Sequence, residues 1–314
     1  MNKFIVALAL IVTMTTSVLA EDLLRIGSTK GSGNYQHASM VAKKLSELGI
    51  KSAPAPHNDQ SDYTKKVNDG ELELAQGNLI ELTMSYYAEL HHEGKPKQEN
   101  LRLVGKSICL FTAYIVPIDS DIKTYADFKG KNIGSEWTGR PTLERLNLAF
   151  LRNGGLTWDD VKGVPVSGLV ESWKLYKQGR IDSMVAAIGA GSMKPINAAI
   201  PSRVLGFDSS SKEIVNQTFG REFRGYEFVN VQPGPWEPMV KEPIDVICVP
   251  YMIYTHVNAS DERIYEVAKA LAAAEFTEPF MRTFDKNKVG TPKNGIPYHP
   301  AAIRAYKELG IYKD

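Results

Sequence analysis

The sequence predicts an α/β protein of two lobes, and three observations support this prediction. Strand-like and helix-like segments alternate along the chain, which is typical of α/β folds. The chain has 314 residues, a length expected for about two domains. No proline- or serine-rich linker separates two halves, so we expect extended strands to join the lobes. The best candidates are Leu101–Val116 and Val246–Val257.

An export leader is expected at the N-terminus, in residues 1–20. It has one basic residue, Lys3, followed by the apolar run Phe4–Val12 and the small-residue cleavage signal Val18–Ala20. The apolar run is too short to span a bilayer comfortably, and no cysteine follows the cleavage signal. We therefore expect a periplasmic chain that begins at Glu21 and carries no lipid anchor.

The charge balance argues against nucleic acid or an acidic membrane surface as the main partner. The full chain has 37 Lys and Arg and 36 Asp and Glu. Loss of Lys3 with the leader leaves 36 of each, so the mature chain is formally neutral. We expect a monomer that uses no cofactor.

The first strand–turn–helix unit carries the strongest functional signal. Leu23–Ile26 is an apolar strand, and a turn with Gly27, Gly31 and Gly33 follows it. The next segment repeats apolar residues at helical spacing, and Gly49 ends it. Unpaired N–H groups at the positive end of such a helix bind anions without a metal or a catalyst. This unit therefore favours the capture of a small acid over its chemical processing.

The rest of the chain continues the alternation of strands and helices. The expected strands are Leu72–Ala75 and Ile181–Ala187, with another in the segment GKNIGS after Tyr125–Phe128. The expected helices are Ser61–Asn68, Arg140–Arg152, Glu171–Lys177, a helix capped by Ser260, and Ala301–Leu309.

The two cysteines lie in the two candidate connecting strands. Cys109 is in Leu101–Val116 and Cys248 is in Val246–Val257, both rich in β-branched and aromatic residues. An exported chain permits a disulfide between them. Two buried thiols that never meet are the alternative, and the sequence leaves both open.

The motifs of common enzyme classes are incomplete. Gly105–Ser107 resembles the end of a phosphate-binding loop, but Asn100 stands where its first glycine is required. Ser209–Lys212 matches SxxK without its KTG or SDN partners. His91 and His92 precede a glycine and a proline, a pattern that favours a solvated loop over a metal site. We therefore predict no catalytic residues, no metal and no enzyme.

Several blocks of the chain carry a resemblance to a known family. They are IGSTKGSGNYQ (26–36), DGELELAQGN (69–78), LRLVGKSICLFTAYIVPIDSDIKTYADFKGKNIG (101–134), QGRIDSMVAAIGAGS (178–192), VPYMIYTHVNASDERIYEVAKAL (249–271) and GIPYHPAAIRAYKELGI (295–311). In this order they resemble the solute receptors of TRAP transporters, specifically the TAXI family. The resemblance implies a type II periplasmic-binding-protein fold, with residues 21–111 plus 254–314 as lobe I and residues 112–253 as lobe II. It also implies two hinge strands, a cleft for a small organic acid or amino acid carboxylate, and delivery of that ligand to TRAP permease subunits.

Ligands of such sheets bind beyond the carboxyl ends of the strands, where four turns are expected to gather. These turns are Ser28–Tyr35, Gln76–Asn78, Ser135–Thr142 and Ala187–Ser192. Arg140 departs from the small residues usual in the family and is expected to contact an anion, with a surface position as the alternative. The expected ligand-binding residues are Ser32, Asn34, Tyr35, Gln76, Asn78, Ser135, Trp137, Thr138, Gly139, Arg140, Thr142 and Gly189, and Trp137 could equally be a core residue.

Two other functions stay open at this point. A secreted domain that senses a ligand for a membrane signalling partner would show the same features. A secreted enzyme on the same fold is a further alternative, because a fold does not determine a function.

Overall fold

The computed structural model describes residues 23–138, 141–211, 213, 226–291 and 295–312. The expected leader and two expected ligand-binding residues, Gly139 and Arg140, lie outside the described residues. Among the helices that the structure describes, none has the length and apolarity needed to cross a membrane.

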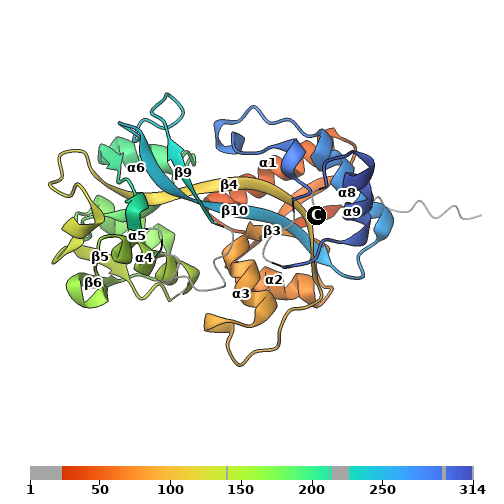
Figure 1. Ribbon diagram of the computed structural model, residues 1–314, viewed down its shortest axis with the longest axis horizontal. Helices are drawn as coiled ribbons and strands as arrows, with labels where there is room; N and C mark the ends of the chain where they lie inside the picture. Colours follow the sequence, from red (N-terminus) through yellow and green to blue (C-terminus); the bar gives the residue numbers. More distant parts are fainter. Residues whose placement is uncertain (1–22, 139–140, 212, 214–225, 292–294, 313–314) are drawn as a thin grey trace, which may run out of the picture.

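Two long strands form the centre of the molecule and run through both of its halves (Figure 1). They are β4 (Leu101–Pro117) and β10 (Ile244–His256), and they pair antiparallel along most of their length. Both predicted strands are confirmed, and this pairing places them side by side. Near the middle both strands change partners: β4 pairs with β7 from Thr112 onward, and β10 passes from β9 to β3 between Cys248 and Tyr251.

The first lobe is built on the order β2-β1-β3-β10 of the main sheet. Its own strands are β1 (Leu24–Thr29), β2 (Ser52–His57) and β3 (Leu74–Asn78), and β1 pairs parallel with both of the others. The sequence pattern missed β2, whose two prolines are tolerated because it lies at the sheet edge. Its helices are α1 (Gly33–Glu47), α2 (Gln60–Asn68), α3 (Leu79–Tyr87), α8 (Asp261–Ala273) and α9 (Pro300–Glu308), with short 3₁₀ turns at Leu90–His92, Pro279–Met281 and Lys286–Lys288.

The second lobe extends the other ends of β4 and β10. β7 (Met184–Ala187) and β8 (Ser202–Val204) pair with β4, and β9 (Glu227–Val231) pairs with β10. β5 (Asn132–Ser135) and β6 (Lys162–Pro165) form a separate parallel pair. The helices are α4 (Pro141–Asn153), α5 (Leu169–Lys177) and α6 (Met193–Ala199), with 3₁₀ turns at Tyr125–Phe128, Trp158–Asp160 and Ser209–Ser211.

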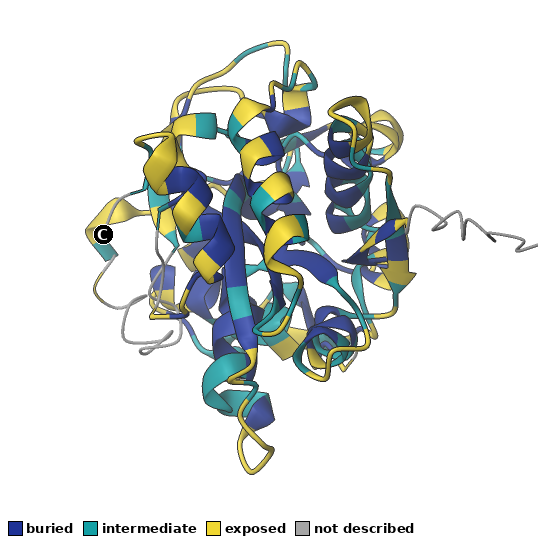
Figure 2. Cartoon of the chain, turned by 90° about the vertical axis from the view of Figure 1, so that its right-hand side faces the viewer, coloured by how far each residue is buried: buried dark blue, intermediate teal, exposed yellow. Residues whose placement is uncertain are grey.

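Each lobe has its core where helices cover the sheet. The strands at the centre are buried, and the helices around them expose only their outer faces (Figure 2). In the second lobe Tyr114, Tyr125 and Phe150 pack with ring centroids 5.2 to 6.1 Å apart, at angles favourable for aromatic pairs. These cores hold the loops at the carboxyl ends of the strands in place.

The two cysteines form a disulfide and are not two separate buried thiols, the alternative that the sequence left open. Their Cα atoms are 5.4 Å apart, and the bond joins β4 to β10. Successive side chains of a strand point to opposite faces. Leu110 and Val249, neighbours of the cysteines, line the cavity described below. The disulfide therefore lies on the opposite face of the connecting strands.

Candidate functional site

A cavity of about 340 Å³ lies between the lobes. The first lobe contributes its β1–α1 turn, the start of α2, and the start of α3 with the segment that follows it. The second lobe contributes the start of α4, parts of α5 and β7, and the start of α6. Four residues of the connecting strands form the remaining wall: Leu110, Thr112, Val249 and Tyr251. Because both lobes and both connecting strands line it, rotation of one lobe against the other would open and close this cavity.

Several helices begin at the cavity, so the positive ends of their dipoles are directed to it. Two of these helix starts are already occupied by side chains. The Asp59 side chain accepts a hydrogen bond from the Asp62 N–H at 2.9 Å, which caps α2. The Asn78 side chain accepts one from the Glu81 N–H at 2.9 Å, which caps α3.

The start of α1 is different because its N-cap side chain does not cap it. Ser32 instead donates its hydroxyl hydrogen to the carbonyl oxygen of Thr29 at 2.7 Å. The backbone N–H groups of Gly33, Asn34 and Tyr35 have no hydrogen-bond acceptor among the described residues. Gly33 and Asn34 line the cavity. This helix start therefore has the unpaired donors that an anion requires.

Five of the expected ligand-binding residues line the cavity: Ser32, Asn34, Asn78, Thr138 and Thr142. Five others do not: Tyr35, Gln76, Ser135, Trp137 and Gly189. The remaining two, Gly139 and Arg140, lie outside the described residues.

Three of the expected residues away from the cavity have structural roles. Gln76 is fully buried, and its amide donates to the carbonyl oxygen of Asn34 at 2.7 Å. Trp137 is a core residue, 2% exposed, whose indole N–H donates to the carbonyl oxygen of Gly134 at 3.0 Å. Gly189 has a φ of +84°, which favours glycine, and its N–H donates to Glu237. A position at the carboxyl end of a strand is therefore not sufficient to place a side chain in the cavity.

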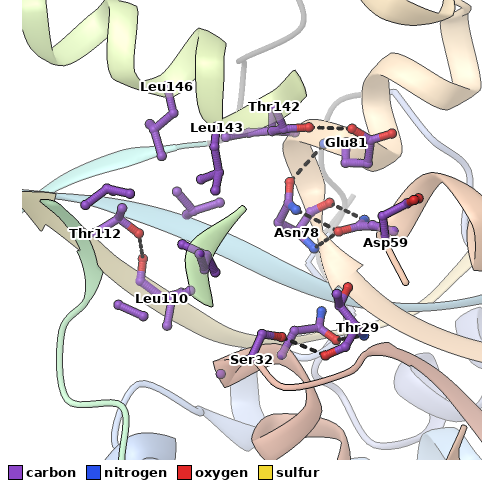
Figure 3. Close-up of a pocket in the computed structure, with 18 of the residues that line it drawn as sticks. Thr29, Ser32, Asp59, Asn78, Glu81, Leu110, Thr112, Thr142, Leu143 and Leu146 are labelled. Carbon is purple, nitrogen blue, oxygen red and sulfur yellow. Dashed lines mark hydrogen bonds between the residues drawn. The ribbon is translucent and has the colours of Figure 1, made fainter. Parts of the chain in front are cut away.

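Sequence reasoning missed Glu81, the most strongly paired acid at the cavity wall. Its carboxylate is 3% exposed and lies 2.7 Å from Nε2 of His92 and 3.2 Å from Nε2 of His91. Ser61 donates to it at 2.7 Å, and Thr142 of α4 donates from the second lobe (Figure 3). The pattern N-x-x-E at residues 78–81 is a signal for a helix start and could have indicated that this acid begins a helix.

The environment of Glu81 favours its charged form. Burial raises the pKa of the carboxyl group, but hydrogen bonds from His91 and His92 lower it more, so the net pKa is well below its usual range. The expectation of a solvated histidine loop is wrong, because His92 is only 4% exposed. Its ring faces the carboxylate of Glu81, which α3 contributes from eleven residues earlier in the chain.

A buried Ser–His pair exists elsewhere in the first lobe. The Ser107 hydroxyl oxygen lies 2.7 Å from Nε2 of His37, but both side chains are almost fully buried and neither lines the cavity. This pair therefore cannot reach a solute held there.

Comparisons with known proteins agree with this architecture. A solved structure described as a periplasmic transporter is 13% identical, with a TM-score of 0.56, and the match covers 92% of this chain and 93% of that one. The periplasmic aliphatic sulphonate binding protein SsuA from Escherichia coli is 18% identical, with a TM-score of 0.50, over 80% of this chain and 68% of that one. The fold is therefore that of periplasmic binding proteins, as predicted. The NMT1-like family matches residues 26–310, almost the whole chain, and this protein belongs to that family.

Proposed function

We propose that the protein is a periplasmic solute-binding receptor, which captures a small organic acid or amino acid carboxylate for a membrane permease of the TRAP (TAXI) type. The observation that carries this proposal is the cavity between the lobes, because both lobes and the connecting strands line it. A receptor of this kind encloses its solute by closure of the lobes and opens to release it.

The chemistry of the walls supports an acid with an apolar part. The unpaired N–H groups at the start of α1 suit a carboxylate. Thr138 and Thr142, which also donates to Glu81, add polar hydroxyl groups to the cavity wall. Leu143, Leu146 and other apolar side chains of the second lobe would bury a carbon chain, as is usual in ligand pockets. From the sequence, we propose Gly139 and Arg140 as further contacts to the anion.

A matched pair of variants at Gly33 tests this proposal. Gly33 is the first residue of α1, a position where proline is well tolerated but has no N–H to donate. Gly33→Ala adds a Cβ that meets the ring of Phe280 at 3.3 Å and keeps the N–H. If a carboxylate accepts this hydrogen bond, Gly33→Pro should bind ~10- to 100-fold more weakly than Gly33→Ala, because a hydrogen bond to a charged group is lost.

A panel of compounds is first screened for thermal stabilisation of the protein. The acid that stabilises most is then used to measure affinities by isothermal titration calorimetry. The panel contains small carboxylates, amino acids, alkanesulfonates and neutral sugars. Stabilisation by sugars alone would refute the anion site, and equal affinities of the proline and alanine variants would refute its location at α1. Stabilisation by sulfonates alone would favour the ligand class named for the Escherichia coli protein. Turnover of the bound compound would instead favour the enzyme alternative.

A further inference from the structure

We propose that Glu81, His91 and His92 bind a divalent transition-metal ion of the Zn²⁺ class at the edge of the cavity. The three side chains place one carboxylate oxygen and two imidazole nitrogens within 4.8 Å of one another. Imidazole and carboxylate are the ligand types that Zn²⁺ uses in sites with three protein ligands and one open position. This inference does not depend on the nature of the solute.

The two distances from the imidazole nitrogens to the carboxylate are close to those between ligand atoms of a tetrahedral site. With metal–ligand bonds of about 2.0 Å, neighbouring ligand atoms stand about 3.3 Å apart. Nε2 of His91 is already 3.2 Å from Oε1 of Glu81. Nε2 of His92 is 2.7 Å from Oε1, a hydrogen bond that an ion would replace with a small outward movement. Both imidazoles direct the same ring nitrogen to one carboxylate.

The chain conformation explains how two adjacent histidines face one acid. After α3 the chain reverses through Ala88 and Leu90, which have φ values of 56° and 53°. These left-handed conformations are uncommon for residues with a side chain. They turn the segment with His91 and His92 back onto the first turn of α3, where the ring centroids stand 4.2 Å apart.

The surroundings of the cluster supply the two other requirements of a metal site. Hydroxyl groups of Ser61 and Thr142 donate hydrogen bonds to Glu81 and hold its carboxylate in place. Figure 3 shows the bond from Thr142. Glu81 and His91 line the cavity, so the open coordination position would face it and could accept a water or a solute oxygen. Because Thr142 belongs to α4, the ion would also stabilise the contact between the two lobes.

The experiment uses the mature protein without a histidine tag, after treatment with a chelator. Titration with Co²⁺, followed by visible absorption, and with Zn²⁺, followed by calorimetry, should each give one ion per chain. His91→Ala and Glu81→Gln should each lower the affinity more than ~10-fold, since removing even a supporting residue costs that much. His91 is the most exposed of the three ligands, so its removal disturbs the fold least.

His57→Ala is the matched control. His57 also faces a carboxylate, that of Asp62 at 3.0 Å, but this pair lies outside the cluster. Its removal should leave metal affinity unchanged. Circular dichroism without metal shows whether each variant is folded, and only folded variants are compared. The proposal is overturned if the wild-type protein binds neither ion stoichiometrically. It is equally overturned if folded His91→Ala and Glu81→Gln bind as tightly as the wild type.

Discussion

Replacing Cys109 and Cys248 together by alanine is expected to lower the free energy of unfolding by about 5 kcal/mol. The disulfide closes a loop with a sequence separation of 139 residues. The expected loss of about 5 kcal/mol is the contribution that such a loop makes by lowering the entropy of the unfolded chain. Alanine suits both positions because the cysteines are almost fully buried. Denaturant unfolding of the wild-type and double-alanine proteins measures the difference.

Solute affinity provides the control for this variant. The cysteines and the cavity lie on opposite faces of β4 and β10, so the double variant should bind its solute as the wild type does. Reduction of the wild type should reproduce the loss of stability. If the protein takes up two alkylating groups after denaturation without reductant, the disulfide is absent and the prediction fails.

Acidification from pH 7 to pH 4 is expected to remove about 3 kcal/mol of stability through His37 alone. Complete burial lowers the pKa of this imidazole to about 3, opposed only by the Gln76 side chain. The unfolded chain binds a proton below about pH 6.5, whereas the folded protein keeps the ring neutral, so stability falls as the pH decreases through this window. Each pH unit within it contributes about 1.4 kcal/mol.

His37→Gln separates this contribution from those of other groups. Carboxyl groups such as Asp127, whose pKa is lowered by backbone N–H donors, add the same acid sensitivity to both proteins. The variant should be less stable than the wild type at pH 7, because the ring fills a buried site against Ser107 and Tyr251. Its stability should fall less steeply between pH 6.5 and pH 4. Parallel stability curves for the two proteins would contradict the prediction.

The cysteine pair illustrates which features a sequence can predict. The two connecting strands were predictable because each is a long run of β-branched and aromatic residues, and composition alone marks such runs. The register in which they pair was not predictable. The register sets Cys248 opposite Phe111 and next to Cys109, and register depends on the packing of the whole sheet.

The candidate site divides in the same way. The glycine-rich turn before α1 has a local signature, because glycine and helix-start patterns act over a few residues. The cluster around Glu81 has no such local signature. Its chain reversal uses left-handed backbone conformations at Ala88 and Leu90, and a sequence pattern predicts that conformation only at glycine or asparagine. Thr142 joins the cluster from the other lobe, 61 residues away.

The sequence by itself determined the α/β class, the two connecting strands and the glycine-rich turn that leads into the first helix. Each of these depends on side-chain periodicity or backbone preference within a short segment. Only the tertiary structure decided that Asn78 lines the cavity while Gln76 is buried away from it, that Trp137 belongs to the core, and that the cysteines are joined. These outcomes depend on contacts between distant residues, and such contacts exist only once the packed lobes have set the strand register and the positions of the helices.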